Sequence, residues 1–303
     1  MELREELRGP RIASAGAETI RPAVSCQLGA AGAIVTRMTG KPDRSQQVTI
    51  DAMLAASKRD TRRVPIRNTF VQQGSQSDPE PGPLHEMVRR HDERCLDLFL
   101  LHRMMASADP WDVRPMPAKA WARALGVHHD RDGGKAAVSK AWRRLDQTYH
   151  LIEVGRSGQR GKYTSLSEDG SGDPYTSPDG RARTNRYLTL PFEYWTGPDF
   201  WFRQLSLPAK AVLLIGSSLA PGFLLPTTEK AQRWYGISGD TVGRGLTELL
   251  GLKLLERASV LKDTPLEDSV QTREYRYTLA APFGRQSPPK KKSGLSLIVT
   301  KGA

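Results

Sequence analysis

The sequence predicts an α+β, mainly helical chain with two copies of one helical module behind a disordered N-terminal segment. Three observations lead to this prediction. Residues 207–279 show apolar residues at helical spacing and then two strand-like stretches, and residues 84–166 repeat that order less regularly. Residues 1–83 keep no sustained apolar period. A length of 303 residues suggests two domains, since a typical domain has about 150 residues.

The charge balance of the chain favours a polyanionic partner. Its 45 Lys and Arg residues exceed its 33 Asp and Glu residues, which gives a formal net charge of +12. A strongly basic chain points to nucleic acid first and to an anionic membrane second. No apolar run is long enough to cross a bilayer, and the charged start MELREELRGPR has no signal core. We therefore expect a cytoplasmic, nucleoid-associated protein without a membrane partner, in which Cys26 and Cys95 are free thiols.

The N-terminal segment, residues 1–83, is expected to be largely disordered and to end in a Pro-rich linker. Ala, Gly, Ser, Arg and Gln dominate it, and such a composition buries little apolar surface. A short helix is predicted within it over Thr49–Lys58, where three apolar residues share one face: Ile50, Met53 and Leu54. The stretch MTGKPDRS is typical of an N-terminus, so Met38 is an alternative start.

The first module, residues 84–190, begins with a predicted helix over Leu84–Ser107 that carries a wide apolar stripe. The elements expected after it are a strand within Trp111–Met116, a helix over Pro117–Leu125, a turn at Gly126–Val127, a helix over Lys135–Asp146, strands over Leu151–Val154 and Tyr163–Leu166, an acidic loop over Ser167–Gly180 and a strand over Arg186–Leu190. The helix over Lys135–Asp146 has two different faces. Its buried side is predicted from four apolar residues at i, i+3, i+4 and i+7: Val138, Ala141, Trp142 and Leu145.

The second module, residues 191–283, opens with an aromatic segment, Phe192–Phe202. Its rings suit either stacking on single-stranded bases or packing between domains or in a dimer. Packing is favoured because an apolar helix starts at Leu207. A short capped helix, a turn at Gly236–Ser238, a second helix and two strands around an acidic loop follow. Residues 284–303 are expected to be a basic flexible tail.

The two modules can be aligned with each other. In each, a short helix is followed by Gly-Val or Gly-Ile, by a second helix, and by Leu-Ile-Glu or Leu-Leu-Glu at the start of a strand. Val138 to Leu151 spans 13 residues, and Val242 to Leu254 spans 12. The main difference is the turn before the second helix, which is about six residues longer in the first module.

The turn and second helix of the second module resemble a known DNA-binding motif. The stretch W-Y-G-I-S-G-D-T-V-G-R-G-L is similar to the L-G-V-S-x-x-T-V-x-R-x-L pattern of winged helix-turn-helix domains, although Gln232 stands where that pattern usually has Ala. The matching residues are Gly236, Ser238, Thr241, Val242, Arg244 and Leu246. Residues 207–279 therefore look like a winged helix, and residues 84–166 are similar but less regular. Two winged helices on one chain resemble the initiator proteins of iteron-type plasmids, and helix-turn-helix transcription regulators are the broader match.

This resemblance implies contact with double-stranded DNA. A helix in the major groove presents the polar residues of its exposed face to base edges, and a basic hairpin tip follows the backbone or enters the minor groove. In the second module Glu248 is expected on the same exposed face as the candidates. The candidate DNA-binding residues are Lys135, Ser139, Lys140, Arg143, Arg144, Arg156, Arg160, Lys162, Ser238, Thr241, Arg244 and Thr247.

The two modules differ in charge. From Pro117 to Leu166, ten Lys or Arg against four acidic residues leave a net charge of +6, whereas from Arg203 to Ala280 ten against eight leave +2. Phosphate contacts come from Lys and Arg and make binding salt-dependent. The first module is therefore expected to hold the DNA backbone, and the second to discriminate bases or to bind a partner.

No enzyme, cofactor or metal site is predicted. His128, His129, Asp130 and Asp132 lie in one polar turn without a matching cluster elsewhere, so we interpret them as turn residues. The stretch Gly155–Lys162 is one residue too long for a phosphate-binding loop, and Tyr163 replaces the Ser or Thr that would bind magnesium. It is interpreted as a hairpin tip.

The expected function is sequence-specific binding of double-stranded DNA. Transcription regulation is the first expectation for the process, and replication initiation of a plasmid or other mobile element is the alternative. A winged-helix scaffold subunit of a chromosome-organising complex is an alternative from another class, and the basic face argues against it. Two modules can recognise one long site as a monomer or repeated sites as a homodimer.

Overall fold

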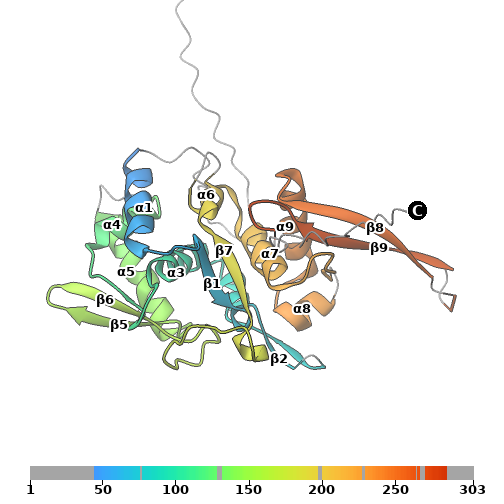
Figure 1. The fold of residues 1–303 in the computed structure, drawn as a ribbon, viewed down its shortest axis with the longest axis horizontal. Helices are drawn as coiled ribbons and strands as arrows, with labels where there is room; N and C mark the ends of the chain where they lie inside the picture. Colours follow the sequence, from blue (N-terminus) through green and yellow to red (C-terminus); the bar gives the residue numbers. More distant parts are fainter. Residues whose placement is uncertain are drawn as a thin grey trace, which may run out of the picture. The chain divides into compact units, whose positions relative to one another are not determined.

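Helices alternate with short antiparallel sheets along the chain (Figure 1). The computed structural model describes residues 44–75, 77–127, 132–196, 200–226, 229–263, 265–266 and 270–284, all within the unit from Thr39 to Ala303. The fold is therefore α+β, as predicted. Helices account for 44% of the described residues, which does not confirm the expectation of a mainly helical chain.

The segment before the first module is folded from Arg44 onwards. It forms α1 (Arg44–Ser57), β1 (Arg63–Arg67), the 3-10 turn η1 (Asn68–Phe70), β2 (Gln72–Gly74) and β3 (Pro79–Pro81). The expectation of a largely disordered segment is thus wrong for residues 44–75 and 77–83. Helix α1 buries the three apolar residues on which the short helix was predicted, Ile50, Met53 and Leu54, and packs them against α3 and α4. Residues 1–43, with Cys26 and Met38, lie outside the described part.

The first module contains four helices and a three-stranded sheet. Its elements are α2 (Leu84–Arg89), α3 (Glu93–Met105), β4 (Asp112–Val113), α4 (Ala118–Ala124), α5 (Asp132–Gln147), β5 (Ile152–Ser157) and β6 (Arg160–Ser165). The strands are arranged β4–β6–β5. The nearly continuous burial of α3 makes it the central helix of this module, and α5 packs across it.

Two helix boundaries differ from the prediction. The single helix expected over Leu84–Ser107 is two helices, because His91 adopts a left-handed conformation with φ 53° and turns the chain between α2 and α3. Helix α5 starts at Asp132 rather than Lys135, so the turn before it is shorter than expected. Both predictions used apolar periodicity, which continues through a one-residue kink and is absent from the polar first turn of a helix.

The end of the first module and the start of the second contribute to a sheet and a buried aromatic cluster. They form the 3-10 turn η2 (Arg183–Asn185), β7 (Tyr187–Pro191), the 3-10 turn η3 (Phe192–Tyr194) and α6 (Trp201–Gln204). Strand β7 pairs with β1, from Arg63 opposite Pro191 to Arg67 opposite Tyr187. Most rings of the aromatic segment are no more than 3% exposed, which confirms the packing interpretation: Phe192, Tyr194, Trp195, Phe200 and Phe202. Residues 197–199 lie outside the described part.

The second module repeats the element order of the first. It consists of α7 (Leu207–Ser218), α8 (Glu229–Tyr235), α9 (Gly239–Gly251), β8 (Leu255–Asp263) and β9 (Gln271–Leu279). An isolated bridge joins Phe223 to Tyr277 of β9, in the position that β4 takes beside β6 in the first module. The predicted turn at Gly236 is present with φ 65°, and a Cβ there would lie 2.6 Å from the Cβ of His85.

A buried ion pair connects the central helices of the two modules. Lys210 of α7 is 1% exposed, and its Nζ lies 2.8 Å from Glu93 Oε1 and 2.7 Å from Asp97 Oδ1 on α3. A second link runs through polar side chains, because Arg203 donates to Gln46 and Gln46 donates to the carbonyl oxygen of Ala124. These contacts position the modules relative to each other within the described unit.

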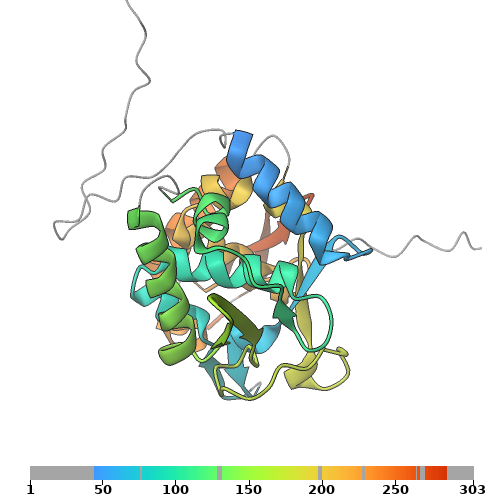
Figure 2. The ribbon, with the colours of Figure 1, turned by 90° about the vertical axis from the view of Figure 1, so that its left-hand side faces the viewer.

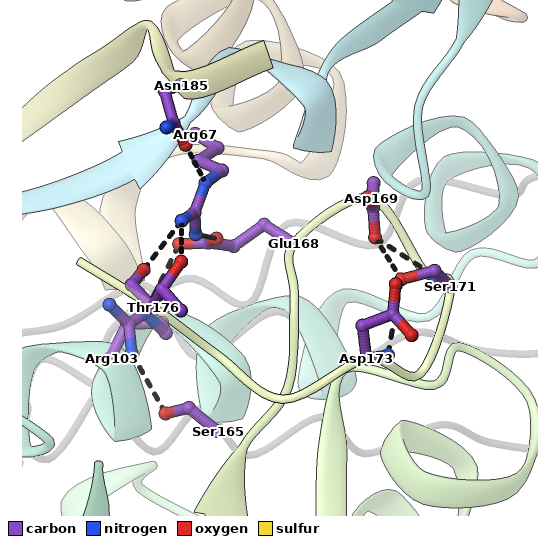
Figure 3. A network of polar contacts seen from close by, with 9 residues as sticks. All are labelled: Arg67, Arg103, Ser165, Glu168, Asp169, Ser171, Asp173, Thr176 and Asn185. Carbon is purple, nitrogen blue, oxygen red and sulfur yellow. Dashed lines mark hydrogen bonds and ion pairs between the residues drawn. The ribbon is translucent and has the colours of Figure 1, made fainter. Parts of the chain in front are cut away.

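The acidic loop after β6 is tied to the fold by one buried carboxylate (Figure 3). Glu168 is fully buried and accepts a hydrogen bond of 2.7 Å from Arg67, while Arg103 Nε lies 3.6 Å from its other oxygen. Arg103 also lies over the ring of Tyr175, at 3.8 Å from the ring centre. Arg67 donates further hydrogen bonds to Thr176 and Asn185. The loop is thereby held to β1 and α3 at both of its ends.

Candidate nucleic-acid interface

Helix α5 has one buried and one exposed face, as predicted. The four residues predicted to be buried are at most 2% exposed: Val138, Ala141, Trp142 and Leu145. The opposite face consists of exposed residues at i, i+3, i+4 and i+7, namely Ala136, Ser139, Lys140 and Arg143. The structure thus brings three predicted site residues together on one stripe. It adds Ala136, which lay within the predicted helix but is not polar and so was not a candidate.

Stacked aromatic rings fix the orientation of that face. Trp142 of α5 stacks on Tyr163 of β6 with ring centres 3.9 Å apart, and its edge meets Trp121 of α4 at 5.1 Å. His102 of α3 lies 3.0 Å from the carbonyl oxygen of Tyr163, and burial lowers the pKa of His102 to about 3, so its ring is neutral. Helix α5, helix α4 and the hairpin are therefore packed together through these rings.

The β5–β6 hairpin lies beside α5 (Figure 2). Three of the predicted DNA-binding residues are on this hairpin: Arg156, Arg160 and Lys162. Its tip turns at Gly158, where φ is 59°. Arg156 and Arg160 are exposed, and Arg160 donates to the carbonyl oxygen of Pro115 at 3.3 Å. Lys162 is partly exposed and pairs with Asp112 Oδ2 at 3.0 Å. Arg156 is therefore the hairpin cation with the most freedom among those predicted to bind DNA.

Arg144 has a different position from its neighbour Arg143. Its Nε lies 2.6 Å from Asp92 Oδ2 and its guanidinium also contacts the Sγ of Cys95 at 3.4 Å. Tyr149 donates to the same carboxylate at 3.0 Å, and burial raises the pKa of the free Cys95 thiol to about 12. Arg144 thus anchors α5 to the start of α3. Lys135, at the start of α5, is also only partly exposed.

The exposed face of α9 is nearly neutral. Ser238 caps the helix by accepting from the amide of Thr241 at 3.2 Å. Asp240, Arg244 and Thr247 are exposed, but Arg244 pairs with Asp240 at 3.0 Å and Thr247 donates to a carbonyl oxygen of its own helix. Glu248 was expected on this face and instead accepts from the amide of Ser206 at 2.8 Å, at the start of α7.

The two helix faces lie in different parts of the fold. In Figure 1, α5 and the β5–β6 hairpin are on the left and α9 is on the right, with α3 and α7 between them. The candidate residues therefore form two separate surfaces. Sequence periodicity assigned residues to faces of single helices, but the distance between the faces depends on long-range contacts such as the pair of Lys210 with Asp97.

Comparisons with protein families, with curated proteins and with solved structures find no match for this chain. Within the described residues, no group of three or more His, Cys, Asp or Glu side chains is arranged to hold a metal ion. Most of the polar turn considered above for a metal site, residues 128–130, lies outside the described part. None of the helices in the described ranges is both long and apolar enough to cross a bilayer.

Proposed function

We propose that this protein binds double-stranded DNA in a sequence-specific way through two winged helices. The repeated element order supports this, since each module has a central helix, a short strand or bridge, two further helices and a hairpin. In a winged helix the last of the three helices enters the major groove and the hairpin contacts the flanking backbone. Helices α5 and α9 occupy that place here.

The observation that carries the proposal is the exposed stripe of α5. Lys140 and Arg143 form no ion pair with any side chain in the described ranges, and Ala136 and Ser139 beside them are small. Small residues allow a helix to approach the floor of a groove, and unpaired cations gain by contact with phosphates or guanine. Arg156 extends this basic surface onto the hairpin.

The second module is suited to base discrimination with little backbone contact. Arg244 and Asp240 are both more than 60% exposed. A solvent-exposed i,i+4 pair contributes only about 0.3–0.5 kcal/mol. Exchanging Asp240 for a guanine edge therefore costs Arg244 little, whereas the acidic neighbour disfavours a nearby phosphate.

For the biological process, we propose transcription regulation. Replication initiation is the second candidate, and the buried link between Lys210 and Asp97 favours it, because two rigidly connected reading helices suit one long or repeated site. Genome-wide immunoprecipitation distinguishes the two. Binding at promoters supports a regulator, and binding at repeats near a replication origin supports an initiator.

The DNA-binding proposal is tested by a double substitution on α5, Lys140→Ala with Arg143→Ala. If both residues contact phosphates, the slope of log affinity against log salt falls by about 2, since each phosphate contact contributes about 0.9. Fluorescence anisotropy on labelled duplexes over a range of salt concentrations measures the slope. The matched control is Arg181→Ala with Arg183→Ala, which removes the same charge from exposed positions outside the helices α5 and α9 and outside both hairpins. Equal slopes for the two double variants would contradict the proposal.

A further inference from the structure

Strand β8 of the second hairpin has an open edge. Within the described residues β8 and β9 form a sheet of two strands, and the hairpin extends beyond the helices of its module (Figure 1). The outer edge of β9 is covered near its base, because the amide of Tyr277 donates to the carbonyl oxygen of Phe223 at 2.8 Å. No comparable contact from another described residue covers β8 from Glu256 to Lys262, where every residue is exposed.

The register identifies the backbone groups that face the open edge. The Tyr277 amide points away from β8, so Tyr277 and Arg257, which lie opposite each other, form a non-hydrogen-bonded pair. Backbone direction alternates along a strand. The N–H and C=O groups of Arg257, Ser259 and Leu261 therefore point to the open edge, where they are available to a further strand.

The sequence of β8 is complementary to itself around Ser259. In an antiparallel pair of two β8 strands centred on that residue, Glu256 of each copy lies opposite Lys262 of the other. Ala258 then lies opposite Val260. No ion pair involving Glu256 or Lys262 is found among the described residues, so both charges are available to a partner.

The same register covers the exposed aliphatic side chains of the strand. Val260 is 43% exposed and Leu261 is 61% exposed, which is unusual for apolar residues on a strand edge. Leu261 would lie opposite Arg257 of the second copy. That arginine is stacked 4.7 Å above the centre of the Tyr275 ring, so its stem and the ring form an apolar surface for Leu261.

We propose that two copies of this chain associate through their β8 strands in this antiparallel register. The two hairpins then form one continuous four-stranded sheet. The two-fold axis passes between the two Ser259 residues. Such an assembly places two pairs of reading helices in a symmetric arrangement and occupies an edge that would otherwise favour uncontrolled strand pairing. The dimer does not depend on DNA.

A charge exchange tests the pairing in the full-length chain. Lys262→Glu puts like charges opposite each other at both ends of the paired region and should raise the dissociation constant of the dimer about tenfold or more. Glu256→Lys combined with Lys262→Glu should restore it. Lys253→Glu, just before β8, makes the same charge change outside the pair and should have no effect. Sedimentation equilibrium measures the dissociation constants.

Several results would overturn the proposal. These are a wild-type chain that stays monomeric at all concentrations, a dimer that is insensitive to Lys262→Glu, or a double variant that is no more dimeric than the single one. Ser259→Pro is a second test of the dimer. The Ser259 amide forms no hydrogen bond with β9, so its removal leaves the hydrogen bonds of the hairpin intact and blocks only the open edge. This variant should be a folded monomer, with folding checked by circular dichroism. A folded dimer would contradict pairing through the β8 edge.

Cysteine cross-linking tests the register. Opposed residues of a hydrogen-bonded antiparallel pair have Cα atoms about 5.5 Å apart, within the range of a disulfide. In a Cys26→Ser background, Ser259→Cys should give a covalent dimer on oxidation. Arg257→Cys alone should give none, since its counterpart is Leu261 of the other copy. A covalent dimer from Arg257→Cys but not from Ser259→Cys would show that the register is wrong.

Discussion

The two modules have the same order of elements but present different surfaces. In the first, the exposed stripe of α5 carries Lys140 and Arg143, which form no ion pair with another described residue, and the hairpin beside it is short and basic. In the second, the charge of Arg244 is balanced by Asp240, and the hairpin is longer, with nine residues in each strand. Packing constrains only the buried faces, so the exposed faces of the two copies can differ. In the proposed function, the first copy contacts the DNA backbone and the second discriminates bases.

The buried faces are similar in both modules. Val138 in α5 and Val242 in α9 occupy equivalent positions in the alignment of the modules, and both are fully buried. Exposed residues are free to differ, since surface substitutions usually change stability by no more than about 0.5 kcal/mol. The difference in charge between the modules is therefore not imposed by their packing.

The largest expected effect concerns the buried ion pair between the modules. Lys210→Ala leaves Asp97 and Glu93 without their cation, and breaking a buried pair in this way costs about 3–5 kcal/mol. Urea unfolding should show one transition that shifts as a whole. Lys119→Ala, on the exposed side of α4, is the control and should change stability little. Two separate transitions, of which only one shifts, would mean that the modules fold independently.

A smaller effect on DNA affinity distinguishes base discrimination by α9 from backbone contact by α5. Arg244→Ala should lower affinity for the cognate duplex by as much as about 3 kcal/mol and leave binding to random duplexes nearly unchanged, because a base contact is lost. Arg143→Ala should weaken binding to both duplexes alike and reduce the salt slope. Competition assays with the two duplexes measure the ratio. Equal losses on both duplexes for Arg244→Ala would remove the proposed difference between α5 and α9.

Local patterns predicted much of the fold. The apolar residues at i, i+3, i+4 and i+7 identified the buried face of α5, and the Gly-Ile-Ser turn located the start of α9. Both signals lie within a few residues of the element they describe. The prediction of a disordered segment up to residue 83 is wrong because β1 is stabilised by β7, more than a hundred residues later.

The candidate site was predicted less completely than the fold. Arg143 and Arg144 were assigned to one face, but successive helical residues are about 100° apart and Arg144 lies near the boundary. Asp92, which comes from another helix, decides that Arg144 turns inward. The same limit applies to Lys210, because its sequence context is an apolar helix and its partners are on α3.

The excess of negative charge around Lys210, between α3 and α7, predicts that the stability of the fold depends on pH. One lysine faces two carboxylates, and burial raises the pKa of Asp97 to about 7 against the attraction of Lys210. The folded protein therefore holds a proton on Asp97 that the unfolded chain has lost above its ordinary pKa of 3.8. The unfolding free energy should fall as pH rises from about 4 to about 7, by about 4 kcal/mol, and then level off. Asp97→Asn should flatten that slope in urea titrations, and an unchanged slope would assign the effect to another group.

The smallest expected effect uses the two adjacent arginines of α5. The side chain of Arg144 is 38% exposed, so its ion pair with Asp92 is partly screened by solvent. Arg144→Ala removes this pair and should lower the unfolding free energy by about 1 kcal/mol. It should leave the salt slope of DNA binding unchanged. Arg143→Ala, one position earlier, should do the reverse, with a lower slope and unchanged stability. If both variants altered the slope equally, Arg144 would have to leave Asp92 when DNA binds, and the holding surface of the first module would extend to the start of α3.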